Sequence, residues 1–262
     1  MKRGYFKSNN LCLSYIDYSK GESEKILLAL HGHFGNARMF SSLASSLDDW
    51  KVFALDQRGH GWSEHPVNRD YSRETYIEDI KHFITTVLNN KSVVLLGHSL
   101  GGANAYQFAS KYPELVKAMI IEDIGAEIEG DASYATLFPH RVASLKELKD
   151  VVESRWKGSF RYFGESAFED EHGWGFRFDS KGMMVSQQNL NGSWWSDWTN
   201  TDCPTLLIHG TNSDVVNLSQ VKKMKQARKN TTIKAFEGCG HTIHDDDPLG
   251  FNNTVKNFLE SL

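Results

Sequence analysis

Short apolar runs alternate with amphipathic stretches along most of the chain. The apolar runs predict buried strands, of which the last is the weakest: 25–32, 51–61, 92–97, 116–125, 204–210 and 231–241. Residues 71–88 carry apolar side chains three or four positions apart, and this spacing predicts a helix with one buried face. Further helices are predicted over 102–113, where Pro113 ends the pattern, and over 248–262.

Continuous apolar strands separated by helices predict a doubly wound, mostly parallel sheet of the α/β class, covered by helices on both faces. Binding sites in such sheets form at the carboxyl ends of the strands. Each predicted strand ends in glycine, histidine, aspartate or serine. The sequence therefore predicts that polar residues converge at one edge of the sheet.

Between residues 126 and 200 the alternation is lost and aromatic residues accumulate. Five of the seven tryptophans lie there: Trp156, Trp174, Trp194, Trp195 and Trp198. We expect one core, made of residues 1–125 and 201–262, interrupted by a mainly helical lid over 126–200. Its aromatic side chains either pack the lid onto the core or line a substrate cavity, and the two roles are compatible.

Composition narrows the classes of function. The 262 residues suffice for one large α/β domain, and a net charge of −4 without a basic run argues against a nucleic-acid or anionic-membrane partner. Cys12, Cys203 and Cys239 form no closely spaced pair, so neither a disulfide framework nor a zinc site is expected. The N-terminus lacks the apolar segment of a secretory signal, and no apolar run approaches a membrane span. We expect a cytoplasmic protein.

The stretch Gly97-His98-Ser99-Leu100-Gly101 falls between a predicted strand and a predicted helix. A Gly-x-Ser-x-Gly sequence in this context is the nucleophile elbow, a strained turn that exposes the serine hydroxyl above the sheet. The two glycines leave room for the turn, and the N-terminus of the following helix favours a developing negative charge. Ser99 is therefore the candidate nucleophile.

A serine nucleophile needs a base, and the base needs an acid that orients it. His241 follows the flexible Gly-Cys-Gly segment late in the chain and is the candidate base, while His244 starts the last helical region. The acidic run Asp245-Asp246-Asp247 before Pro248 fits helix capping better than metal binding, so no metal is expected.

Two aspartates stand at carboxyl ends of predicted strands and could orient the base. They are Asp123, after the 116–125 run, and Asp214, after the 204–210 run. Backbone N–H groups must also bind the oxyanion. We expect these from Leu100, which follows the nucleophile, and from His33 in the loop after the first parallel strand.

These segments together resemble the α/β-hydrolase superfamily over essentially the whole chain. LALHGHFGNA is similar to its oxyanion loop, ALDQRGHGWS to its D-x-R-G-x-G-x-S turn, LLGHSLGG to its elbow, and GCGHTIHDDDP to its histidine loop. Many members carry the acid three residues after the glycine that ends its strand, a position held here by Ser213. In a subset the acid ends the preceding strand, where Asp123 stands. The resemblance therefore favours Asp123 over Asp214.

The resemblance implies a serine hydrolase that forms an acyl-enzyme from an ester or thioester, without a metal or cofactor. The aromatic lid suggests a small to medium, apolar or aromatic substrate, contacted by Phe34, His98, Trp156 and Trp195. Alternatives on the same triad are a C–C bond hydrolase and a cofactor-free perhydrolase. A small-ligand sensor that signals through a partner protein is the alternative of another class. We expect an ester-like small-molecule substrate and a monomer or homodimer.

Overall fold

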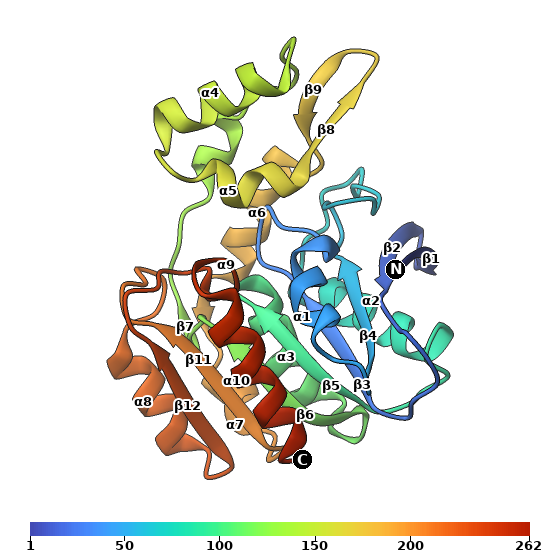
Figure 1. The fold of residues 1–262 in the computed structure, drawn as a ribbon, viewed down its shortest axis with the longest axis vertical. Coiled ribbons are helices and arrows are strands. Elements are labelled where there is room, and N and C mark those ends of the chain that lie inside the picture. The colour runs from blue at the N-terminus through green and yellow to red at the C-terminus, as the bar shows by residue number, and fades with distance from the viewer.

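The computed structural model describes residues 1–262, and its centre is an eight-stranded sheet (Figure 1). The strand order is β1-β2-β4-β3-β5-β6-β11-β12. The strands are β1 (Lys2–Ser8), β2 (Leu11–Asp17), β3 (Ile26–Leu30), β4 (Lys51–Asp56), β5 (Val93–His98), β6 (Val116–Glu122), β11 (Thr205–Gly210) and β12 (Thr231–Phe236). From β4 to β12 all neighbours pair in parallel, which confirms the mostly parallel sheet expected from the apolar runs.

Helices cover both faces of the sheet, and the sheet separates two hydrophobic clusters. The cluster on one face includes side chains of α2 (Arg73–Thr86), α3 (Leu100–Lys111) and α8 (Leu218–Ala227). The cluster on the other face includes side chains of α1 (Ser41–Ser45), α9 (Ile243–Asp246) and α10 (Pro248–Glu260). In β5 and β6, successive side chains alternate between the two clusters, as the pleat of a strand requires.

The predicted apolar stripe of α2 is buried as expected. Tyr76, Ile80, Phe83 and Ile84 are all at most 1% exposed, so this helix is held to the sheet by a continuous apolar face. None of the helices is both long and apolar enough to cross a membrane.

Between β6 and β11 the chain leaves the sheet, and we call residues 126–200 the insertion. Figure 1 shows α4, α5, β8 and β9 at one end of the molecule, beyond the carboxyl ends of the strands. Its elements are β7 (Glu127–Ile128), α4 (Leu145–Arg155), α5 (Phe160–Phe163), β8 (Ala167–Asp170), β9 (Gly173–Phe176), α6 (Ser180–Leu190), β10 (Gly192–Ser193) and α7 (Trp195–Thr199). The insertion thus holds two small antiparallel pairs, β8-β9 and β7-β10, besides its helices.

Aromatic side chains of the insertion form one cluster that reaches the core. The Phe138 ring lies 4.9 Å from Trp156 and 4.9 Å from Phe163 between ring centroids. Phe178 in turn lies 5.1 Å from Phe34, which belongs to the loop after β3. These contacts pack the insertion against that loop.

Candidate active site

Ser99 occupies a strained turn between β5 and α3. Its φ of 52° lies in the left-handed region, which is costly for a residue with a side chain. A Cβ added at Gly97 would collide with the backbone of Gly101, and one added at Gly101 would collide with the carbonyl of Leu30. Only glycines allow the chain to pass so closely, and this explains the residue pattern around the serine.

Asp123 stands at the matching place on the neighbouring strand. It follows β6, has a φ of 51° and is 1% exposed. Its Oδ2 lies 2.8 Å from Nδ1 of His241, and its Oδ1 accepts a hydrogen bond from the backbone N–H of Gly210 at 3.2 Å. The Ser213 hydroxyl donates to the same carboxylate. These donors fix the orientation of the carboxylate beside the imidazole.

Asp214, the other candidate acid, lies at the rim of the same cavity. Its side chain is exposed and forms no hydrogen bond with His241. The loop after β11 instead directs Ser213 toward the Asp123 carboxylate. The structure therefore brings only Asp123 to the histidine.

Ser99 and His241 line a cavity of about 510 Å³ between the core and the insertion. The structure shows no hydrogen bond from Ser99 Oγ, and contacts between a nucleophile and its base often tighten only when a substrate binds. Phe34 lines the cavity as expected, together with residues of the insertion such as Tyr134, Tyr162 and Phe163. The rim carries Glu129, Asp131 and Asp214.

Three residues expected to contact substrate lie outside this cavity. His98 is fully buried, because the side chain of the last residue of β5, directly before the candidate nucleophile, points to the opposite face of the sheet. Trp156 packs on Phe138 within the aromatic cluster. Trp195 is turned away, and its indole N–H donates to Glu127 at 2.9 Å.

The expected oxyanion donors are the backbone N–H groups of Leu100 and His33. Leu100 is the first residue of α3, so its N–H has no acceptor within the helix. His33 lies in the loop after β3 and lines the cavity, and its carbonyl accepts a hydrogen bond from the Tyr162 hydroxyl at 2.7 Å. Burial and the nearby Arg73 lower the pKa of His33 to about 3, so its ring stays neutral.

The acidic run before α10 is used for capping. Asp247 accepts a hydrogen bond from Gly250 N–H at 2.9 Å, which confirms the expected cap, and Asp246 accepts one from Gly240 N–H at 2.8 Å. The first contact holds a backbone N–H of the last helix, and the second holds the backbone directly before His241.

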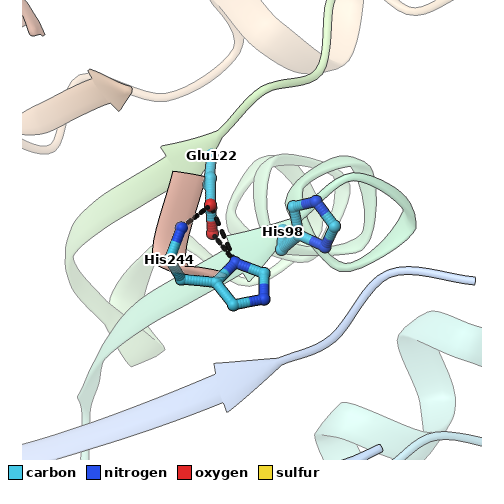
Figure 2. Close-up of side chains that lie close together, drawn as sticks. All are labelled: His98, Glu122 and His244. Atoms are coloured by element: carbon cyan, nitrogen blue, oxygen red, sulfur yellow. Dashed lines mark hydrogen bonds and ion pairs between the residues drawn. The ribbon is translucent and has the colours of Figure 1, made fainter. Parts of the chain in front are cut away.

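A different group has the composition of a metal site, namely His98, Glu122 and His244 (Figure 2). All three are buried, with their ligand atoms within 4.8 Å of one another. Glu122 and one ring nitrogen of each histidine already have hydrogen-bond partners, whereas His98 Nδ1 and His244 Nε2 have none. Both Glu122 oxygens lie close to His244 Nδ1, at 2.8 and 3.0 Å, and His98 Nε2 lies 3.0 Å from the carbonyl of His241.

The pKa values of the two histidines are shifted in opposite directions. Burial by itself would lower the pKa of His244, but the Glu122 carboxylate and its hydrogen bond outweigh burial and raise that pKa. Burial and the neighbouring histidines hold the pKa of His98 well below its usual value. Glu122 and His244 are therefore paired electrostatically as well as by hydrogen bonds, beside a histidine whose neutral form is favoured.

Sequence reasoning missed several residues around the site. Glu122 and Tyr162 contact the proposed catalytic groups or their loops, but no spacing rule marks them. Ser213 was singled out only as the position where many related sequences carry the acid, and its contact with Asp123 was not foreseen. Glu122 does carry a signal, because a charged residue that ends an otherwise apolar strand needs a buried partner.

The comparisons with known proteins agree with this architecture. The family model described as alpha/beta hydrolase fold matches residues 25–173. The chain is 26% identical over 251 residues to 2-(acetamidomethylene)succinate hydrolase of Mesorhizobium japonicum, covering 91% of this chain and 89% of that one. It is 28% identical over 271 residues to the sn-1-specific diacylglycerol lipase ABHD11 of Danio rerio, covering 96% and 83%.

Solved structures show the same fold. The crystal structure of E-2-(acetamidomethylene)succinate hydrolase superposes with a TM-score of 0.87, covering 99% of both chains at 23% identity. At that identity the likeness concerns the fold alone.

Proposed function

Because the chain belongs to the α/β-hydrolase fold family, we propose that it is a serine hydrolase of ester or thioester bonds with Ser99 as nucleophile, His241 as base and Asp123 as acid. The observation that carries this proposal is the 2.8 Å contact between His241 Nδ1 and the buried Asp123 carboxylate, beside a cavity that Ser99 also lines.

The chemistry follows from the placement of these groups. His241 Nε2 accepts the proton of Ser99 as Oγ attacks the acyl carbon, and Asp123 stabilises the imidazolium that forms. The N–H groups of His33 and Leu100 bind the oxyanion of the tetrahedral intermediate. Collapse expels the alcohol or thiol, which takes the proton from His241. A water activated by His241 then releases the acid and restores Ser99.

The cavity favours a small to medium acyl group. A volume of about 510 Å³ is typical of a small-molecule site, and Phe34, Ile124, Tyr134 and Phe163 provide apolar walls. The curated relatives include a hydrolase and a lipase, which supports hydrolysis as the reaction class.

Hydrolysis of nitrophenyl esters from acetate to decanoate tests the proposal. We expect multiple turnovers by the wild type and a loss of at least about 10³-fold in kcat for Ser99→Ala. Ser159→Ala is the matched control, since Ser159 lines the same cavity, and it should retain activity within a few-fold. Equal rates for wild type and Ser99→Ala, or no turnover by the wild type across the series, would overturn the proposal.

A further inference from the structure

The residues directly before the nucleophile and the acid form a pair of their own. His98 ends β5 and Glu122 ends β6, and the two lie opposite each other in the register of these parallel strands. Their side chains point away from the cavity, to the face covered by α9 and α10. Both are 0% exposed, so neither touches substrate.

Both residues bind the loop that carries His241, as Figure 2 shows for Glu122 and His244. Glu122 Oε1 accepts a hydrogen bond from the backbone N–H of His244 at 2.9 Å and one from its Nδ1 at 2.8 Å. His98 Nε2 lies 3.0 Å from the carbonyl oxygen of His241. A carbonyl only accepts, so His98 is the tautomer that carries its proton on Nε2.

The loop needs such anchors because of its sequence. His241 follows Gly238-Cys239-Gly240, and Gly238 has a φ of 77°, so the backbone before the base has little stiffness of its own. The Asp123 contact fixes the imidazole ring, but it does not fix the backbone from which the ring projects. The links to His98 and Glu122 act on that backbone.

We propose that His98 and Glu122 are positioning residues that hold the His241 loop against the same two strand ends that present Ser99 and Asp123. His98 and the proposed nucleophile Ser99 are then consecutive residues at the end of β5. Glu122 and the proposed acid Asp123 are consecutive residues at the end of the adjacent strand β6. A joint shift of the two strand ends then moves the nucleophile, the acid and the base together. This proposal rests on the proposed catalytic roles of Ser99, His241 and Asp123.

Kinetics of Glu122→Gln and of two His98 variants test the proposal. Glu122→Gln keeps the size of the side chain but removes the charge that binds His244. His98→Leu removes the donor to the His241 carbonyl, whereas His98→Gln places an amide N–H near the position of Nε2. Because displacements of about 1 Å cost about 100-fold, we expect kcat to fall about 10- to 100-fold in Glu122→Gln and His98→Leu, with KM within about twofold. His98→Gln should recover part of the loss.

A second background separates positioning from a general loss of structure. In a His241→Ala enzyme the loop no longer carries a base, so adding Glu122→Gln should leave the residual rate unchanged. An equal fall in both backgrounds would show a merely structural role and overturn the proposal. An unchanged kcat in folded Glu122→Gln and His98→Leu would also overturn it.

Asp245→Asn is the matched control for loss of a carboxylate. Asp245 lies on the same short helix, with an oxygen 4.0 Å from His244 Nε2, but its side chain forms no hydrogen bond with the loop. We expect its kcat to stay within about twofold of wild type.

Metal analysis of the purified protein supplies a further test. A stoichiometric metal whose removal by a chelator lowers kcat would overturn the hydrogen-bonded arrangement in favour of a metal centre. Failure of the proposed function would give a different result, namely full activity in Ser99→Ala.

Discussion

At the scale of single residues, the choice between two aspartates decides the proposed triad. Asp123 and Asp214 both follow strands, and the spacing within the sequence leaves them equivalent as candidates. In the structure, β6 lies beside β11, so one carboxylate sits beneath the base and the other sits at the cavity rim. Ser213 then donates to Asp123 from the position where the acid of many related sequences would lie.

Asparagine substitutions at the two positions should therefore differ sharply. Asp123→Asn keeps the shape but offers an N–H to His241, which favours the wrong tautomer of the ring, so we expect kcat to fall about 10³- to 10⁴-fold. Asp214→Asn should stay within about twofold, because its carboxylate contacts no catalytic group. Steady-state rates with one nitrophenyl ester measure both. A larger loss in Asp214→Asn than in Asp123→Asn would reverse the assignment.

Ser99 and His241 could be proposed from the sequence because short-range sterics mark the first and order in the chain marks the second. The elbow needs small residues two positions from the serine on either side, and the sequence has glycine at both positions. The acid has no such requirement. Its identity depends on which strands are neighbours and on how the 211–217 loop turns, and both are set by long-range packing.

At the scale of elements, the insertion reaches the loop after β3 through hydrogen bonds as well as aromatic packing. The Tyr162 hydroxyl donates to the His33 carbonyl at 2.7 Å, and the Ser166 hydroxyl donates to the Phe34 carbonyl at 2.6 Å. Phe34 has a φ of 67°, so this loop holds a strained conformation that needs support. The insertion therefore orients the peptide units beside the proposed oxyanion site.

We expect Tyr162→Phe to weaken that orientation. Burial raises the pKa of Tyr162, so the hydroxyl remains a donor at all working pH values, and its removal leaves the His33 carbonyl without this partner. The expected fall in kcat is about 10-fold, smaller than the loss of an oxyanion donor itself, with little change in KM. Tyr134→Phe is the control, because Tyr134 lines the same cavity and its hydroxyl donates no hydrogen bond. Equal effects of the two substitutions would contradict this role.

The elements themselves were predictable where burial is continuous. All six predicted strands are present. Five of them are buried along most of their length, so their sequences are nearly continuous apolar runs, whereas the weakest run forms the partly exposed edge strand β12. The hairpin of β1 and β2 was missed, since it lies at the antiparallel edge and mixes exposed and buried positions, with charged residues among them. Helix α8 was missed as well, because only Val221 and Met224 of its ten residues are buried.

At the scale of the whole molecule, a ladder of arginine and aromatic side chains joins the insertion to the edge of the core. Its order is Arg141, Phe168, Arg177, Trp62 and Arg3, with guanidinium carbons 4.5, 4.4, 3.7 and 5.4 Å from the successive ring centroids. The outer arginines pair with acids, Arg141 with Asp170 and Arg3 with Asp56. The central Arg177 has no acidic partner and lies against Phe168 and Trp62, so it links the β8-β9 pair to the core.

Removing Arg177 should loosen the insertion without unfolding the sheet. Each ring contact is worth about 0.5–2 kcal/mol, so Arg177→Ala should speed hydrogen exchange of the β8-β9 amides by about 10-fold or more. Exchange in β5 and β6 should not change, because those strands are held by the core clusters. Arg177→Lys should give an intermediate rate, since an ammonium keeps the charge but not the planar stacking. Lys181→Ala is the control, because Lys181 lines a surface cleft together with Trp62 and Arg177 but stacks on no ring. If Arg177→Ala and Lys181→Ala had the same effect, net charge and not stacking would hold the insertion in place.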